Sequence, residues 1–109
     1  MKDWDMLIDH LIKFREERDW KQFHNAKDLA LAVSIEAAEL NELFLWKGPE
    51  QADKEKIKEE LADIFSFALL LVKEYDLDLN AIVLEKIKKN ALKYPVEKSK
   101  GSAKKYDEL

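Results

Sequence analysis

Two pairs of acidic residues interrupt apolar stripes that recur with the spacing of an α-helix. Glu36 and Glu39 are three residues apart, as are Glu60 and Asp63, so each pair shares one helix face. Apolar residues surround both pairs on those faces: Leu29, Ala32, Val33, Leu40 and Leu43 in the first stripe, and Ile57, Ile64, Phe67 and Leu70 in the second. Helix faces of this composition pack into a core. Two such helices lying antiparallel would therefore bring four carboxylates together inside a bundle.

Four neighbouring carboxylates in an apolar setting require a cation, because buried charge is costly and like charges oppose joint ionisation. Neither stripe has an Arg or Lys at the required positions, so a divalent metal is expected, and oxygen-only ligation suits Mg²⁺, with Mn²⁺ as a substitute. A ferritin-like iron site would need Glu-x-x-His pairs, and neither His10 nor His24 follows a glutamate by three residues. A single acidic pair is also common on exposed helix faces. The prediction therefore depends on both pairs lying within apolar stripes.

Composition predicts an all-α fold. The chain has 109 residues, enough for one domain, with only two glycines and two prolines, while Ala, Leu, Glu and Lys predominate. Apolar periodicity and capping residues predict four helices, at about 3–18, 26–46, 53–75 and 79–93. Asn25 and Asp78 are the predicted N-caps, Gly48-Pro49 ends the second helix, and Pro95 follows the fourth. We predict one all-α domain over residues 1–95 and a polar, basic tail over residues 96–109.

The second half of the third predicted helix is apolar on every side, from Ile64 to Val72, apart from Ser66. A single thin bundle hardly encloses such a helix, so we expect a subunit interface that completes the bundle. Both a homodimer and a dimer of dimers satisfy this requirement. The run is far shorter than the ~20 residues that cross a membrane, so no membrane association is expected.

Charge and cysteine content narrow the functional classes. The net charge of −4 gives no support to a nucleic-acid polymer as partner. The absence of cysteine excludes disulfides and thiolate zinc sites, and the acidic start lacks the apolar region of a signal peptide, so a cytoplasmic location is expected. From Lys86 to Lys105 the chain is rich in lysine, with Glu97 as its one acid. That segment is either a phosphate-contacting surface or a solvated basic tail.

Four segments, in this order along the chain, resemble the MazG-like all-α nucleoside triphosphate pyrophosphohydrolases, and within them the dCTP pyrophosphatase branch. They are residues 17–24 (Glu-Arg-Asp-Trp-Lys-Gln-Phe-His), the acidic helix at 36–47, Glu-Glu-Leu-Ala-Asp at 59–63, and 86–95 with its Lys-Tyr-Pro ending. The resemblance implies a four-helix MazG-like bundle. It also implies a reaction in which a nucleoside triphosphate and water give the monophosphate and pyrophosphate.

The resemblance also implies roles for particular residues. Glu36, Glu39, Glu60 and Asp63 would bind Mg²⁺, which grips the triphosphate, and Glu39 is our choice for the residue that orients or deprotonates the water. The substrate-binding residues implied are Trp20, His24 and Trp46 for the base, Phe67 beside them, and Lys86, Asn90 and Tyr94 for phosphate and sugar. Taken singly, Trp20 and Trp46 also fit ordinary core or rim positions, and Lys86 fits a solvated helix face.

Two positions depart from the family pattern. Close relatives often have tyrosine where this chain has Phe67, and some have histidine where it has Leu11. Base preference is therefore less defined than the metal site, and we expect dCTP or a related or modified nucleotide as substrate. The alternative function is a non-catalytic helical dimerisation or adaptor module, which explains the apolar third helix but not the acids within the stripes.

Overall fold

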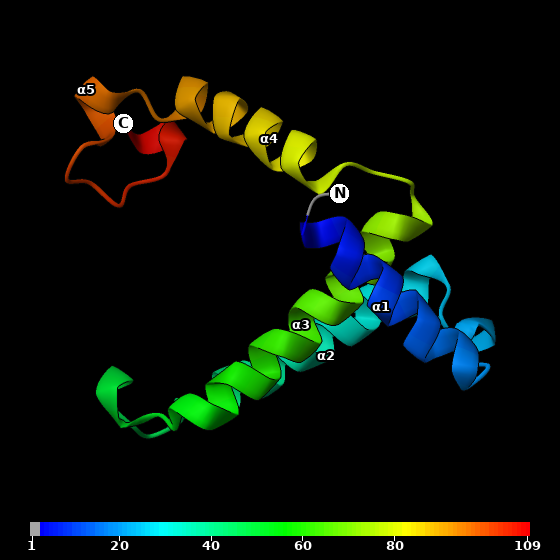
Figure 1. Cartoon of the computed structure of the whole chain (residues 1–109). Coiled ribbons are helices and arrows are strands. Elements are labelled where there is room, and N and C mark those ends of the chain that lie inside the picture. The colour runs from blue at the N-terminus through cyan, green and yellow to red at the C-terminus, as the bar shows by residue number, and fades with distance from the viewer. Residues whose placement is uncertain (1–2) are drawn as a thin grey trace. The chain divides into compact units, whose positions relative to one another are not determined.

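The computed structural model describes residues 3–109, and these contain helices and no strand, which confirms the all-α prediction (Figure 1). No helix in this part of the chain has the length and hydropathy needed to cross a lipid bilayer. The α-helices are α1 (Asp3–Glu17), α2 (Ala26–Glu42), α3 (Lys54–Glu74), α4 (Leu79–Lys93) and α5 (Val96–Ser99). Three short 3₁₀ turns join or follow them: η1 (Lys21–Phe23), η2 (Pro49–Gln51) and η3 (Tyr106–Glu108).

Side-chain caps set where three of the helices begin. The Asn25 side-chain oxygen accepts a hydrogen bond from the backbone N–H of Asp28 at 2.9 Å, as expected for the start of α2. Asp78 accepts from the Ala81 N–H at 3.1 Å at the start of α4. Asp53 caps α3 in the same way, through the Glu55 N–H at 2.9 Å. Each cap satisfies a backbone donor that the first turn leaves without a partner.

The helix ends depend on left-handed residues that are not glycine. Asp19, Trp46 and Asp76 have φ angles of 54°, 62° and 53° and follow α1, α2 and α3. We expected α2 to continue to about Trp46, but regular helix ends at Glu42. The next residues tighten into i→i+3 hydrogen bonds, such as Phe44 N–H to Asn41 O at 3.1 Å, and Trp46 then reverses the backbone.

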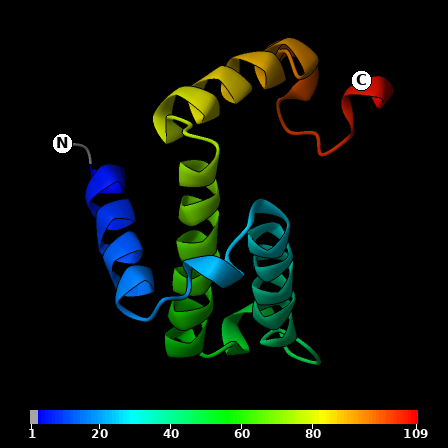
Figure 2. The ribbon, with the colours of Figure 1, turned by 90° about the vertical axis from the view of Figure 1, so that its right-hand side faces the viewer.

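The chain divides into two compact units, one up to Leu77 and the other Asp78–Leu109. In the first unit α2 and α3 form an antiparallel pair, and α1 packs against α3 on its other side (Figure 2). The buried apolar side chains recorded in the described residues all lie in this unit: Ile8, Leu29, Leu69 and Leu70. The second unit holds α4, α5 and η3, and the Tyr94 ring packs edge-on against Tyr106 at 6.2 Å. The predicted division at residue 95 stays a prediction.

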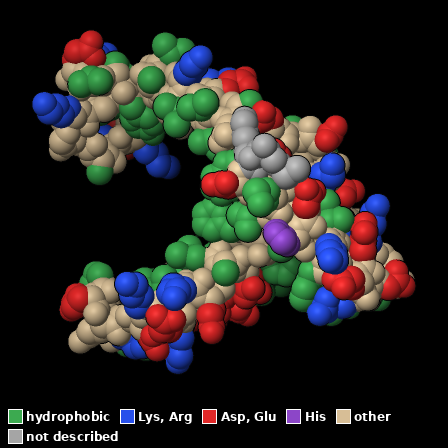
Figure 3. Space-filling view, viewed as in Figure 1, with side chains coloured by type: hydrophobic (Ala, Val, Ile, Leu, Met, Phe, Trp, Pro, Cys, Tyr) green, Lys and Arg blue, Asp and Glu red, His purple; other side chains and the backbone are tan. Residues whose placement is uncertain are grey.

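Much of the apolar surface of α3 is open to solvent in the single chain. Leu69 and Leu70 are buried, but Phe65 is 54% exposed and Leu61 is 39% exposed. Figure 3 shows hydrophobic side chains on the surface of this face of the molecule. The all-round burial that we expected for this helix is therefore incomplete within one chain.

Candidate metal centre and adjoining cavity

Three of the four predicted metal ligands converge where α2 faces α3. Glu36 comes from α2, while Glu60 and Asp63 lie one turn apart on α3, and one carboxylate oxygen from each lies within 4.8 Å of the other two. Glu39 lies one turn after Glu36 and outside this triad, and its carboxylate contacts that of Glu36. The antiparallel pairing of two acidic i, i+3 pairs produces the cluster, as the sequence pattern predicts.

The carboxylates of the triad lack the partners that buried acids normally have. One oxygen of Glu36 and one of Glu60 are buried without any hydrogen-bond donor. Burial raises the pKa of Glu36 to about 7, and contacts with the carboxyl groups of Glu39 and Glu60 and the charge of Asp63 add to this effect. Donor-free carboxylate oxygens of this kind fit a hard divalent cation such as Mg²⁺.

The raised pKa of Glu36 predicts that metal-free protein loses stability as the pH rises. The folded state holds this proton up to about pH 7, whereas the unfolded chain releases it near 4.5, so the free energy of unfolding falls between these values. We expect the Tm of the wild type, measured in chelator across this range, to fall relative to that of the Glu36→Gln variant.

The comparison with Glu36→Gln separates this effect from that of His24. Burial, and secondarily the charge of Arg15, lower the pKa of His24, so that group makes stability rise with pH up to about its unfolded value of 6.5. Both proteins keep His24, so its contribution cancels in the difference between their Tm curves. Parallel curves from pH 4.5 to 7 would contradict the assignment to Glu36.

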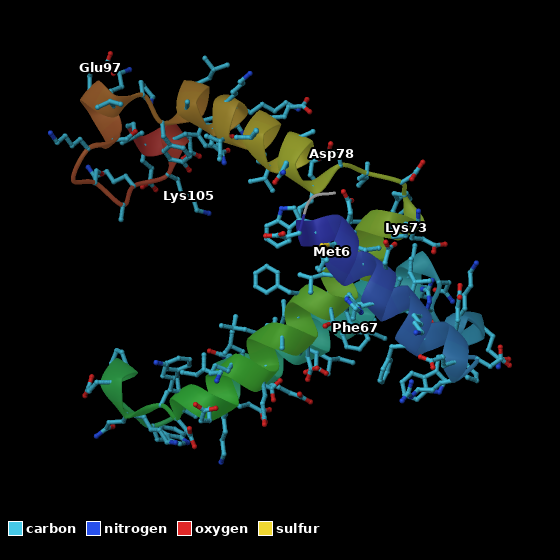
Figure 4. All side chains as sticks on the ribbon, in the orientation of Figure 1. Met6, Phe67, Lys73, Asp78, Glu97 and Lys105 are labelled. Atoms are coloured by element: carbon cyan, nitrogen blue, oxygen red, sulfur yellow. The ribbon has the colours of Figure 1, made fainter. Side chains whose placement is uncertain are left out.

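A cavity of about 360 Å³ adjoins the triad, and Asp63 belongs to both. Its volume is within the range of small-molecule sites. The lining comes from α1, from the connector around η1, and from α3: Leu11, Phe14, Arg15, Trp20, His24, Asp63, Ser66, Phe67 and Leu70. Figure 4 labels Phe67 on α3, beside α1. The cavity therefore has a mostly aromatic and aliphatic wall, with one cation, Arg15, and one acidic group, Asp63, at the candidate metal centre.

Aromatic contacts hold the rings of this wall in place. The Phe67 and His24 rings pack edge to face with their centroids 6.3 Å apart, and Phe14 and Trp20 do so at 5.7 Å. The Arg18 guanidinium lies 3.7 Å from the centroid of the Phe14 ring. Because its pKa is lowered, His24 is neutral at neutral pH, and its buried Nδ1 has no hydrogen-bond partner. A flat, partly polar ligand would find both stacking surfaces and an unused hydrogen-bonding group here.

The structure brings together three of the predicted substrate-binding residues and leaves one apart. Trp20, His24 and Phe67 line the cavity. Trp46 does not, and it is 99% exposed, because the backbone reversal after α2 turns it into solvent. Lys86, Asn90 and Tyr94 are exposed residues of the second unit, the first two on α4 and Tyr94 as its C-cap, and their role stays a prediction.

Arg15 is the charged cavity residue that the sequence prediction missed. It is only 6% exposed, and its Nε and Nη1 have no hydrogen-bond partner among the described residues. A signal was present, because Arg15 follows Ile8 by seven residues and Leu11 by four and so lies on the apolar face of α1. A charge on an apolar helix face indicates a bound partner, as it does for the acids of α2 and α3.

Comparison with known proteins decides the family. The sequence model of the MazG-like family matches residues 31–109. The chain belongs to the MazG-like family. The resemblance stated from the four segments is thereby confirmed, and the two acidic pairs, Glu36 with Glu39 and Glu60 with Asp63, lie within the matched range.

Individual MazG-like relatives agree with this assignment. The chain is 39% identical to dCTP pyrophosphatase 1 of Rattus norvegicus and 37% identical to that of Homo sapiens, in each case over 105 residues that cover 89% of this chain. The match spans 62% of the length of these relatives. A crystal structure of a pyrophosphatase from Archaeoglobus fulgidus superimposes with a TM-score of 0.80 at 34% identity, covering 87% of this chain and 94% of that one. The fold is accordingly that of a MazG-like protein.

Proposed function

We propose that the protein is a Mg²⁺-dependent nucleoside triphosphate pyrophosphohydrolase acting on dCTP or a related or modified deoxynucleotide. The observation that carries the proposal is the carboxylate triad of Glu36, Glu60 and Asp63 at the edge of a cavity walled by aromatic rings. The acids would bind a cation that in turn binds the triphosphate, and the aromatic rings would stack against the base. The names of the relatives, dCTP pyrophosphatase 1 and a pyrophosphatase, support both the reaction and the substrate.

The reaction breaks the anhydride bond between the α- and β-phosphates, and water supplies the oxygen and protons that complete the monophosphate and pyrophosphate. A bound Mg²⁺ would neutralise the triphosphate and polarise its phosphoryl oxygens. Glu36, Glu60 and Asp63 would hold that ion, with Glu39 completing the set from the next turn of α2. Glu39 is exposed and lies outside the triad that it borders through Glu36, and we assign to it the orientation or deprotonation of the water.

The base would lie in the cavity between aromatic side chains. Stacking on Trp20 and contact with Phe67 each use ring surface that the cavity exposes, and a stacked base gains roughly 1–3 kcal/mol. Neutral His24 offers one donor or acceptor to the base edge. Trp46 holds a left-handed φ of 62° although it is bulky and fully exposed, and strain of this kind is typical of residues kept for binding. Lys86, Asn90 and Tyr94 are the proposed phosphate and sugar contacts.

The direct test is incubation of the purified chain with dCTP and Mg²⁺, with the products separated and identified. We expect dCMP and pyrophosphate in equal amounts, and no turnover once a chelator removes the metal. Release of orthophosphate would contradict the reaction class. A failure to hydrolyse any member of a nucleotide panel, with Mg²⁺ or Mn²⁺, would favour the helical adaptor alternative.

We also propose that the active form is a homodimer or a dimer of dimers that covers α3. The four buried apolar side chains among the described residues are a small core for a unit of this length, and Phe65 and Leu61 are open on α3. Exposed apolar surface of this kind usually marks an interface. The solution mass tests this proposal, and we expect a multiple of the 12.8 kDa chain mass.

A further inference from the structure

Arg15 is a buried cation in the wall of the cavity, and two of its three guanidinium nitrogens have no hydrogen-bond partner in the described residues. Its side chain projects from the last turn of α1 among Leu11, Phe14 and Trp20, and it is more than nine-tenths buried. Buried donors in native proteins nearly always have acceptors, and a buried guanidinium without one is strongly destabilising. Nε and Nη1 have no hydrogen-bond partner in the described residues. The group therefore calls for an acceptor that enters the cavity from outside.

The neighbours of Arg15 do not supply that acceptor. His24 lines the same cavity, and the positive charge of Arg15 contributes, after burial, to lowering the pKa of His24. Asp63 is the carboxylate of the cavity wall, but it belongs to the metal centre, and no ion pair joins it to Arg15 within the described chain. The remaining walls are aromatic and aliphatic apart from Ser66, whose hydroxyl donates to the Ala62 carbonyl at 2.7 Å.

We propose that Arg15 is the residue that selects the base, by donating two parallel hydrogen bonds to a nucleobase edge that carries two adjacent acceptors. The inference rests on the proposed function for its substrate class. A guanidinium has only donors, and Nη2 forms a planar fork with either Nε or Nη1, the two nitrogens that have no partner in the described residues. Its setting among aromatic rings suits a flat base, whereas the phosphates belong with the cation at the acidic end of the cavity.

The chemistry of the four bases makes this contact selective. Cytosine presents N3 and O2 as adjacent acceptors, and guanine presents N7 and O6. Thymine separates O2 from O4 by the N3–H donor, and adenine places its amino donor beside each acceptor of its outer edges. A donor-only fork in a dry wall therefore accepts cytosine or guanine and rejects thymine and adenine, because the wrong base leaves a donor facing the cation.

The experiment removes first the donors of Arg15 and then one acceptor of the base. On the protein side, Arg15→Met keeps the length and apolar stem but removes the donors, Arg15→Lys keeps the charge but not the fork, and Lys13→Met is the control for loss of an exposed charge from the same helix. On the ligand side, 3-deaza-dCTP lacks the N3 acceptor of cytosine and 7-deaza-dGTP lacks the N7 acceptor of guanine. We measure kcat/KM for pyrophosphate release with dCTP, dGTP, dTTP, dATP and the two deaza nucleotides.

For the wild type we expect the deaza change to lower kcat/KM for the accepted base by roughly tenfold to a hundredfold. With the intact nucleotide, Arg15→Met should have a kcat/KM lower than that of the wild type by the same factor. With the deaza nucleotide, its kcat/KM should fall no further. Arg15→Lys should resemble Arg15→Met, and Lys13→Met should resemble the wild type. Loss with 3-deaza-dCTP assigns the contact to cytosine, and loss with 7-deaza-dGTP assigns it to guanine. An equal loss for all nucleotides in Arg15→Met, or no deaza effect in the wild type, would overturn the proposal.

A binding arm keeps this test separate from that of the proposed function. Calorimetric titration of the metal-free wild type with dCMP, dGMP, dTMP and 3-deaza-dCMP requires no turnover. If the protein hydrolyses no nucleotide but binds dCMP or dGMP at least tenfold more tightly than dTMP, and Arg15→Met loses this preference, the proposed activity fails and the role of Arg15 stands. If hydrolysis occurs and these ligands bind equally, Arg15 does not select the base. The deaza ligands probe the intact protein, so the test survives a variant that does not fold.

Discussion

Replacing Asp63 with asparagine is expected to lower kcat/KM for pyrophosphate release from dCTP by about a thousandfold, equivalent to about 4 kcal/mol of transition-state stabilisation. Asp63 is the residue that the carboxylate triad and the cavity share, so in the proposed site its charge would hold the cation next to the substrate. The amide keeps the shape of the side chain but removes the negative charge that a hard cation requires. Steady-state kinetics, together with calorimetric titration of Mg²⁺, measure the two effects.

The fold should persist in this variant, because Asp63 is exposed and repels the charge of Glu36. We expect the metal-free Tm to equal or exceed that of the wild type. Glu59→Gln is the matched control, since Glu59 is an exposed acid of α3 outside the triad, and its loss removes the same charge from the same helix. Full activity in Asp63→Asn, or an equal loss in Glu59→Gln, would remove the metal-site assignment.

Replacing Phe65 with glutamate is expected to convert the oligomer to the 12.8 kDa chain and to lower the Tm by roughly 10 °C or more. Phe65 lies between Leu61 and Leu69 at i, i+4 spacing on α3, and it borders a largely apolar cavity of about 460 Å³ that Leu7 and Leu69 also line. If a second copy covers this stripe, each glutamate becomes a charge buried without a partner. Light scattering gives the mass, and thermal unfolding gives the Tm.

Lys58→Glu is the control on the same helix. It also introduces a glutamate, but at an exposed position whose ion pair with Glu55, at 3.3 Å, contributes little to stability. We expect its mass and Tm to match those of the wild type. A wild-type mass of 12.8 kDa would contradict the oligomer itself, and an unchanged mass in Phe65→Glu would move the interface away from α3.

The helices were predictable because the forces that define them act over three or four residues. The caps at Asn25 and Asp78 hold as predicted, since each needs only a side-chain oxygen and an N–H three residues later. The end of α2 was misplaced because a left-handed Trp46 is not a favoured helix terminator, whereas Gly48-Pro49 is. The turn is instead held by backbone hydrogen bonds, such as Leu45 N–H to Glu42 O and Lys47 N–H to Phe44 O.

The candidate site was predictable only in part. Periodicity placed Glu36, Glu60 and Asp63 on facing stripes, and the structure brings them together. It leaves Glu39 outside the triad and Trp46 in solvent, and for Trp46 the cause is the left-handed turn that follows α2. Arg15 was overlooked because exposed arginines are common on helices, and only the packing of α1 on α3 shows that this one is buried.

The sequence by itself determined the helical class, the starts of α2 and α4, the acidic pairs and the family resemblance, because composition, capping and i, i+3 spacing are local properties of the chain. Tertiary structure alone decided which carboxylates share a cation-sized space, which rings wall the cavity, and that an unpaired guanidinium lies among them. The physical reason is that burial and convergence arise when separate helices pack. The free energy of a charge depends on that packing far more than on its neighbours in sequence.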